Sequence, residues 1–457
     1  MSRIRDVPAT GAPAQEERAP AAGGRRLPLS HWGFRVGPAG LEIAGLAVAE
    51  LARRFGTPLY LFDEARLARN AERALADARA ALPGADLLYS LKTNPVPRAL
   101  EILRRHGLGA EVISAEELRA ALGLGFAPRR IVFNGPGKRD DELALAVDCD
   151  ALAHVESLSE ARALARIAAI RGRVARAGIR INPDVSDPDA DRALRMGERG
   201  SVFGLDPDGP EFGLALECLR SAPSVRLESL SLSIGTGITR VEPFRRAARA
   251  LSRVWRRLAA EGVALGTLDL GGGFAVPSEV RYPAGAADAL AAGRPVRIPA
   301  PEEIAGFREV CAAVAEELPG ALVERVVLEP GRLLVADAFH LLARVVRIKD
   351  GPEHPFVVLD ASRAQNALFA ARGYHEIVAV REPDAAPAAR YTIAGPLCAS
   401  FDTYAHGRAL PRLEEGDLLL LLDVGAYNLS AQSQWTFRPA PVLALGRGEP
   451  GVVPLRG

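Results

Sequence analysis

The chain has 457 residues, more than the roughly 250–300 at which a single hydrophobic core stops growing, so we expect two domains. Its net charge of +1 argues against a role that depends on nucleic acid or a membrane surface. The four cysteines and seven histidines show neither CxxC nor HxxxH spacing, so we expect free thiols, a cytoplasmic location and no metal site.

The first 27 residues are rich in Pro, Ala, Gly and charge and lack apolar periodicity, which predicts a disordered tail. Residues 28–63 form an N-terminal segment. Its apolar run at 59–62 fits a strand of either domain, and we expect the segment to pack with the second one.

Residues 64–335 alternate short β-like runs with Ala-, Leu- and Arg-rich amphipathic stretches. Helical stretches include 97–106, 115–124, 158–171 and 243–261, and 274–305 is an expected insertion loop. The pattern predicts an α/β fold with a (β/α)8 TIM-type barrel, and it fits an open doubly wound sheet less well. The eight β-like runs are 87–92, 110–114, 131–134, 151–156, 178–182, 227–234, 267–270 and 325–329.

From residue 336 to 457 the helical pattern gives way to further β-like runs, which predicts a second, mostly β domain. These runs are 339–348, 355–359, 391–394, 418–422 and 440–445.

Lys92 is one of three lysines among 57 cationic residues, in a chain that otherwise uses arginine. It follows an apolar run, where a barrel places its functional side chains. A desolvated lysine can lose its proton and add to a carbonyl as a Schiff base, whereas arginine stays protonated. In isolation the residue fits a surface lysine about as well.

Other strand ends carry groups that complement such an amine. Glycine-rich loops after the sixth and seventh runs, at 233–237 and 271–273, can bring backbone N–H groups around a phosphate, although a lone glycine run is more often a turn. Glu329, held before Pro330 and Gly331, fits a salt-bridged strand end or a carboxylate that keeps a heteroaromatic nitrogen protonated. Amine, phosphate cradle and carboxylate together indicate a pyridoxal phosphate site.

Seven motifs, in order, give the chain a resemblance to the fold-type III pyridoxal-phosphate decarboxylases, within them to the diaminopimelate decarboxylase type, related to the ornithine and arginine decarboxylases. The resemblance covers nearly the whole chain after the tail and implies an alanine-racemase-like barrel with a β domain. The motifs are FGTPLY (55–60), YSLKTN (89–94), VISAEEL (112–118), RINPD (180–184), GGGF (271–274), EPGR (329–332) and YHEI (374–377).

The resemblance also implies roles for individual residues in a pyridoxal 5'-phosphate enzyme that removes the α-carboxyl group of an amino acid. Lys92 would bind the cofactor covalently, and Cys398, supplied by the β domain of a partner subunit in a homodimer, would return a proton. The cofactor would be held by Ser233, Gly235, Thr236, Gly237, Gly271, Gly272, Gly273, Glu329, Arg332 and Tyr427. The substrate would meet Arg332, Asp360, Gln365, Ala399 and Asp402.

Three positions depart from the family pattern on the substrate side. Ser233 stands where a histidine usually stacks on the cofactor ring, Ala399 where a glutamate reads the distal end of diaminopimelate, and Gln365 where an arginine binds a substrate carboxylate. Each lost charged contact should cost on the order of 1.5–3 kcal/mol. We therefore expect a related or specialised amino acid as substrate. The alternatives are meso-diaminopimelate itself, in lysine biosynthesis, a racemase, or a catalytically silent regulatory homologue.

Overall fold

The computed structural model describes residues 25–38, 40–188, 190, 194–278, 280, 281, 289, 296–318, 323–363 and 373–456. Most of the predicted tail therefore lies outside the described residues. The prediction is wrong for its end, because Arg25 is 5% exposed and donates to the carbonyl oxygen of Pro383 and to the Asp384 carboxylate. A charged segment that reads as disordered is here paired with an acidic turn of the second domain.

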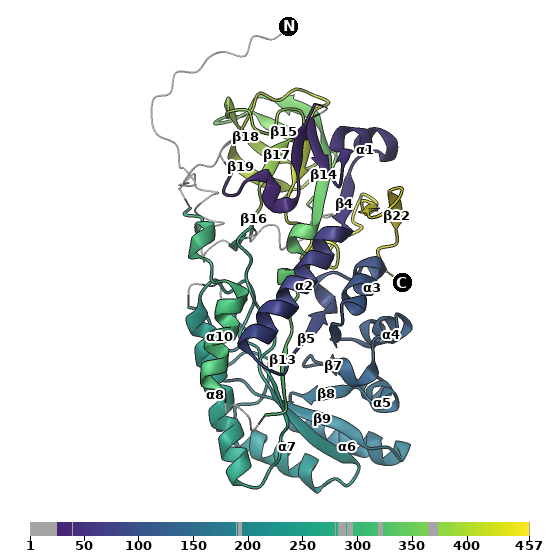
Figure 1. Cartoon of the computed structure of the whole chain (residues 1–457), viewed down its shortest axis with the longest axis vertical. Coiled ribbons are helices and arrows are strands. Elements are labelled where there is room, and N and C mark those ends of the chain that lie inside the picture. The colour runs from purple at the N-terminus through teal and green to yellow at the C-terminus, as the bar shows by residue number, and fades with distance from the viewer. Residues whose placement is uncertain are drawn as a thin grey trace.

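The eight predicted runs of the first domain form one closed barrel of parallel strands, which confirms the (β/α)8 fold (Figure 1). The barrel closes where the last strand, β13, pairs with the first, β5. The strands are β5 (Ala85–Ser90), β6 (Gly109–Val112), β7 (Ile131–Phe133), β8 (Leu152–Val155), β9 (Ala175–Arg180), β10 (Val225–Ser231), β11 (Thr267–Asp269) and β13 (Arg325–Leu328).

Helices surround the barrel, and α3 to α6 begin within ten residues of the strands that precede them. Ser114 and Ser157 accept hydrogen bonds from backbone N–H groups of the first helical turns and so start α4 and α6. The helices are α2 (Glu64–Ala81), α3 (Pro97–Arg105), α4 (Ala115–Gly123), α5 (Asp140–Cys149), α6 (Leu158–Arg171), α7 (Pro210–Ser221), α8 (Val241–Ala260) and α10 (Phe307–Glu317).

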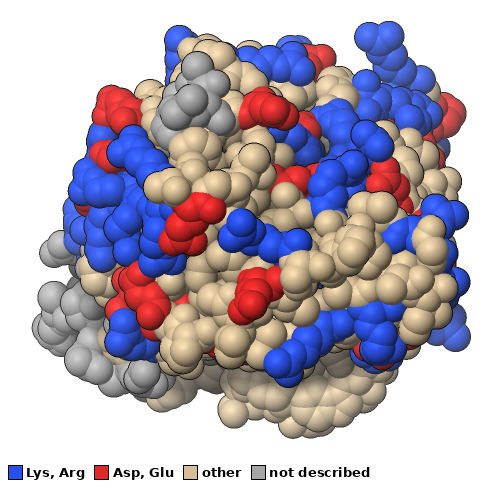
Figure 2. Space-filling model, turned by 90° about the horizontal axis from the view of Figure 1, so that it is seen from below, with Lys and Arg blue, Asp and Glu red and all other residues tan. Residues whose placement is uncertain are grey.

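The barrel surface carries both signs of charge intermixed, as Figure 2 shows for the face seen from below. The arginine-rich helix α8 is an example, because Arg245 and Arg249 pair with Glu316 and Glu317 at the end of α10. None of the helices in the described ranges combines the length and the apolar character that a membrane crossing requires.

The second domain is built on a large, mostly antiparallel sheet that lies above the barrel in Figure 1. β4 (Leu59–Asp63) belongs to this sheet, where it pairs with β14 and β21, so the strand joins the second domain although α2 directly follows it into the barrel. The other strands are β14 (Phe339–Lys349), β15 (Phe356–Leu359), β17 (Ile377–Ala379), β18 (Ala389–Ala394), β19 (Thr403–Leu410), β20 (Leu418–Leu421), β21 (Val442–Leu445) and β22 (Gly451–Val453).

Several elements were not predicted. A three-stranded sheet of β1 (Arg35–Gly37), β2 (Gly40–Ile43) and β3 (Leu46–Ala47), with helix α1 (Val48–Phe55), covers one side of the second domain. The 274–305 insertion also contains structure in its described parts. β12 (Val280–Arg281) pairs with β16 (Gly373–Tyr374), and Val296, Ile298 and Ile304 pack in a small core with Tyr374.

The two domains meet at the loop that carries Lys92. The backbone N–H of Tyr427 donates to the carbonyl oxygen of Thr93 over 2.7 Å, and the Asn94 side chain donates to that of Gly425 over 2.9 Å. This junction places a loop of the second domain directly beside the carboxyl ends of the barrel strands.

Candidate active site

A cavity of about 430 Å³ opens at the carboxyl ends of the barrel strands, a volume typical of a small-molecule site. It is lined by residues from several strand ends and by one residue of the second domain. Those with polar or glycine character are Ser90, Lys92, Glu111, Asn134, Gly135, Gly137, Arg180, Ser231, Ser233, Gly235, Thr236, Asp269, Gly272, Gly273, Glu329, Gly331, Arg332 and Tyr427.

Lys92 lies in the turn after β5, and its Nζ forms an ion pair with Glu111 at the end of β6. The Ser90 hydroxyl donates to the same carboxylate oxygen over 2.6 Å. Burial raises the pKa of Glu111, but Lys92 and Ser90 outweigh that effect and hold the pKa below its ordinary value. Burial lowers the pKa of Lys92, and the facing Glu111 carboxylate reverses this to a net increase. Lys92 is therefore held as an ammonium beside a group that can take its proton.

Two further carboxyl groups lie together on the other side of the cavity. Glu329, after β13, and Asp269, at the end of β11, are buried and lie close enough to influence each other's charge, and Asn134 donates to Glu329 Oε1 over 2.7 Å. Burial, with Asp269 next in importance, raises the pKa of Glu329 well above its ordinary value, and burial raises the pKa of Asp269 to about 7. A carboxyl pair of this kind holds a proton near neutral pH and suits a basic ring nitrogen.

The glycine loops are packed backbone against backbone, which only glycine permits. A Cβ on Gly272 would lie 2.4 Å from the carbonyl oxygen of Glu329, and one on Gly273 would lie 2.5 Å from that of Gly235. Gly271 and Gly273 also have φ values of +64° and +97°, a region that side chains disfavour. The loops after β10, β11 and β13 thus bring their main chains together at the cavity wall, as a phosphate cradle requires.

Arg332 and Tyr427 complete the cavity from the domain junction. Arg332 begins the short helix α11 (Arg332–Val335), and its guanidinium lies 5.3 Å from the centre of the Tyr427 ring. Tyr427 has a φ of +67° and is fixed through its N–H by Thr93. Amine, buried carboxyl pair, glycine loops and arginine in one cavity fit pyridoxal phosphate.

The structure brings together most, but not all, of the predicted site residues. Lys92, Ser233, Gly235, Thr236, Gly272, Gly273, Glu329, Arg332 and Tyr427 line the cavity, while Gly237 and Gly271 lie in the same two loops without lining it. Gln365 lies outside the described residues.

Four predicted substrate-side or catalytic residues do not line the cavity of their own chain. Cys398 is exposed, and Ala399 follows it in the turn between β18 and β19. Asp402 is buried and accepts hydrogen bonds from the N–H groups of Leu397 and Arg363, over 2.8 and 2.6 Å. It thereby holds the Cys398 turn.

Asp360 has a similar place in the second domain. It accepts from the Thr57 hydroxyl over 2.6 Å and from the N–H of Arg344 over 2.8 Å. Its predicted role toward substrate stays a prediction.

Sequence reasoning missed the polar residues that connect the site. Asn134, His154 and Asp269 occur singly in short apolar runs, where each reads as a tolerated core residue. Arg180, which begins the RINPD motif but was assigned no role, ends β9 and donates to buried Glu156 over 2.9 Å. The available signal was their place at or near the carboxyl ends of strands already assigned to a barrel.

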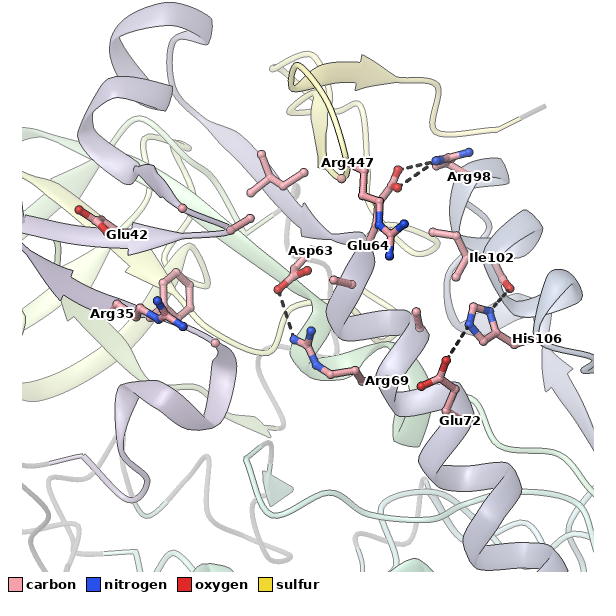
Figure 3. A pocket seen from close by; sticks show the side chains of 18 of the residues that line it. Arg35, Glu42, Asp63, Glu64, Arg69, Glu72, Arg98, Ile102, His106 and Arg447 are labelled. Atoms are coloured by element: carbon pink, nitrogen blue, oxygen red, sulfur yellow. Dashed lines mark hydrogen bonds and ion pairs between the residues drawn. The ribbon is translucent and has the colours of Figure 1, made fainter.

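A larger cleft of about 1090 Å³ lies away from this cavity, between α2, α3 and the small β1–β3 sheet. Several of its charged side chains pair with one another, as Figure 3 shows. Glu64 pairs with Arg98 over 2.6 Å, and Glu72 with His106 over 3.4 Å. We therefore regard this cleft as part of the domain junction, in contrast to the polar cavity around Lys92.

Comparisons with known proteins agree with the chemistry of the cavity. Residues 68–336 match the pyridoxal binding domain of pyridoxal-dependent decarboxylases. The diaminopimelate decarboxylase of Zymomonas mobilis is 32% identical over 87% of this chain and 90% of its own length, and that of Pseudomonas aeruginosa is 34% identical over 91% and 94%.

Solved structures give the same result. The diaminopimelate decarboxylase of M. jannaschii superposes with a TM-score of 0.80 at 26% identity, covering 93% of this chain and 94% of that one. The Helicobacter pylori enzyme, complexed with L-lysine, superposes with a TM-score of 0.75 at 27% identity, covering 89% and 95%.

Proposed function

The chain belongs to the pyridoxal-dependent decarboxylases, and on this premise we propose that it removes the α-carboxyl group of an amino acid related to, but distinct from, diaminopimelate. It is a carboxy-lyase with pyridoxal phosphate as cofactor. The observation that carries the finer proposal is a contrast within one cavity. The amine, the buried carboxyl groups, the glycine loops and the arginine that suit the cofactor all line the cavity, whereas Ala399 and Gln365 stand where charged residues would read the substrate.

Pyridoxal phosphate, when bound, supplies an aldehyde for the amino group and a ring that accepts the electron pair left by carbon dioxide. Lys92 would hold the cofactor through its amine, and the loops at 233–237 and 271–273 would hold the phosphate. Glu111 holds Lys92 as an ammonium, so the pKa values of Glu111 and Lys92 together set the pH at which Lys92 loses the proton that its nitrogen must shed to act as a nucleophile.

Glu329 would hold a proton at the ring nitrogen. Asn134 already donates a hydrogen bond to its oxygen, and the neighbouring Asp269 carboxyl group helps to raise the pKa of Glu329. A carboxylate in this place keeps the ring cationic and so favours loss of the carboxyl group.

The substrate side of the cavity is largely apolar. Leu194, Met196 and Phe203, from the segment after β9, line it, and the Arg180 guanidinium lies 5.0 Å from the centre of the Phe203 ring. Together with Ala399 in place of an acidic residue, this supports a substrate whose distal end is less highly charged than that of diaminopimelate.

A second candidate is meso-diaminopimelate itself. The relatives named diaminopimelate decarboxylase are 32% and 34% identical over most of both chains, and Arg332 lines the cavity, where it could bind a carboxylate.

We also propose that two chains form a homodimer with shared active sites. Cys398 is exposed in its own chain, and near it in the sequence Phe401 stacks on Trp435 with ring centres 5.7 Å apart. These two rings remain 49% and 62% exposed. A second copy covering them would bury a large aromatic surface, and it would bring the Cys398 thiol of one subunit to the cavity of the other as the acid that protonates the α-carbon.

The deciding experiment is release of carbon dioxide from a panel of amino acids by the enzyme with pyridoxal phosphate. The panel includes meso-diaminopimelate, L-lysine, L-ornithine and L-arginine, and the chirality of the recovered substrate is measured in parallel. We expect release from an amino acid other than diaminopimelate, abolished in Lys92→Ala. The highest kcat/KM on diaminopimelate would support the second candidate. Racemised substrate without carbon dioxide would refute decarboxylation, and an absence of cofactor absorbance would indicate a silent homologue.

A further inference from the structure

His154 is a buried histidine in the barrel interior to which the reaction assigns no part. It lies on β8, is 0% exposed, and contacts a polar group with each ring nitrogen. Nδ1 lies 2.8 Å from Asn134 Oδ1, and Nε2 lies 2.9 Å from the hydroxyl of Ser229 on β10. A Cβ on Gly178 would lie 2.2 Å from the ring, so the neighbouring strand β9 leaves room for it with a glycine.

The direction of these hydrogen bonds follows from Glu111. The amide nitrogen of Asn134 lies 3.3 Å from Glu111 Oε1 and 2.7 Å from Glu329 Oε1. Because Glu111 is paired with Lys92 it is ionised, and an ionised carboxylate can only accept. An amide oxygen in this place would oppose a carboxylate oxygen without a proton between them, so Asn134 turns its NH2 group to the two glutamates.

The oxygen of Asn134 then faces His154, and only a hydrogen on Nδ1 can satisfy it. Burial, with Lys138 and Arg180 next in importance, lowers the pKa of His154 well below its ordinary value, so the ring is neutral. A neutral ring with its hydrogen on Nδ1 accepts at Nε2, and Ser229 is the donor there. Asp269 Oδ2, at 4.0 Å from Nδ1, is beyond hydrogen-bond distance.

We propose that His154, as its neutral Nδ1–H tautomer, is a positioning residue that locks the side chain of Asn134 with both amide hydrogens toward Glu111 and Glu329. This inference rests on the proposed role of Glu329 at the ring nitrogen. Without His154, the amide can turn over and present its oxygen to the glutamates. Glu329 then loses its donor, and its ionised form, which the cofactor needs, becomes less favourable.

The first test requires no variant. Selective ¹⁵N labelling of the seven histidines allows the tautomer of each ring to be read by NMR, in the cofactor-free and the cofactor-bound protein. We expect His154 to be neutral with its hydrogen on Nδ1 in both. The opposite tautomer, or a charged ring near pH 7, would overturn the proposal.

The second test measures the dissociation constant of pyridoxal phosphate by absorbance. His154→Leu should weaken binding between about 10-fold and 100-fold, the effect of one hydrogen bond to a charged group. His340→Leu is the matched control, because His340 is equally buried, but in β14, against Phe34. This control should leave the constant unchanged. Circular dichroism of the cofactor-free proteins shows whether each variant folds.

A double-mutant cycle distinguishes the proposed positioning role of His154 from a merely structural one. If His154 acts through Asn134, His154→Leu combined with Asn134→Leu should bind the cofactor no more weakly than Asn134→Leu. Additive losses would overturn the inference. Glu329→Gln separates the two levels of the argument. If it leaves binding and absorbance unchanged, the proposed role of Glu329 is wrong. If Glu329→Gln alters cofactor binding and absorbance but His154→Leu binds the cofactor as well as the His340→Leu control does, only the role of His154 is wrong.

Discussion

Ser90 and Glu111 are register partners on the neighbouring strands β5 and β6, and the Ser90 hydroxyl donates to the carboxylate that holds Lys92. The reactive amine thus rests on a group of the adjacent strand whose position is set by the sheet itself. This arrangement controls when Lys92 can become a nucleophile.

Replacing the carboxylate should change the pH at which the cofactor is taken up. In Glu111→Gln the group that raises the pKa of Lys92 is removed, while burial continues to lower it. We expect the rate at which the cofactor-free protein gains visible absorbance to rise at a lower pH than in the wild type. Stopped-flow mixing with pyridoxal phosphate between pH 6 and 10 measures this. An unchanged profile would show that Glu111 does not control the amine.

Asp269 predicts a pH-dependent stability of the cofactor-free protein. Its pKa is raised to about 7 in the folded chain, so the folded state binds a proton that the unfolded state, with a pKa near 3.8, has already lost. The contribution of Asp269 to the free energy of unfolding is therefore complete below pH 4. It is lost as the pH rises toward 7, which lowers the free energy of unfolding by on the order of 1–4 kcal/mol.

Asp269→Asn keeps an oxygen for the N–H of Gly271 but cannot titrate. Urea unfolding at pH 5 and pH 8 should show a smaller loss of stability in the variant than in the wild type. Equal losses would mean that Asp269 is not the titrating group.

The interlocked glycine loops should tolerate no side chain. In Gly272→Ala the new Cβ would meet the carbonyl oxygen of Glu329, and overpacking of this kind costs about 1–3 kcal/mol. Because the displaced main chain is that of Glu329, we expect weaker cofactor binding as well as a lower unfolding temperature. Gly213→Ala, on the open face of α7, is the control and should show neither effect.

Shared active sites can be tested by mixing two inactive proteins. Lys92→Ala lacks the amine and Cys398→Ala lacks the proposed acid, so a mixed dimer contains one site with both groups intact. Random exchange of subunits should restore about one quarter of the wild-type activity. If no activity returns although exchange is shown by labelled subunits, Cys398 does not act in the partner.

The exposed aromatic pair predicts where that dimer forms. Trp435→Asp should convert a dimer into a monomer, because it places a charge where a second copy would cover the ring. Sedimentation velocity measures the outcome. Ile170→Asp, at an apolar side chain on α6 that is 73% exposed, should leave the mass unchanged. If the Trp435 variant stays dimeric, the dimer interface lies on another surface.

The barrel could be predicted because each strand is a short apolar run followed by an amphipathic helix, a pattern that local sequence carries in full. The sheet of the second domain could not be predicted completely. β4 pairs with β14 and β21, which lie hundreds of residues away in the sequence, and β19 is a run with Gly407 and Arg408 that shows little alternation.

The site residues likewise fall into a group that the sequence could predict and a group that it could not. Lys92, Glu329 and the glycines lie in motifs, and their chemistry is legible from the residues. Asn134 directly follows β7, His154 lies on β8 and Ser229 on β10, and only the closed barrel brings them into contact. Their relation is a property of the barrel interior, which no stretch of sequence contains.

The hydrogen bond from Asn94 to Gly425 joins groups 331 residues apart in the chain. A ribosome that has completed the barrel has not yet made the segment that anchors the turn after Lys92. During synthesis the turn that carries Lys92 therefore lacks this hydrogen bond, and it can form the bond only after the segment around Gly425 has been made. Truncated chains would consequently fail to capture the cofactor, so binding of pyridoxal phosphate would report that the protein is complete.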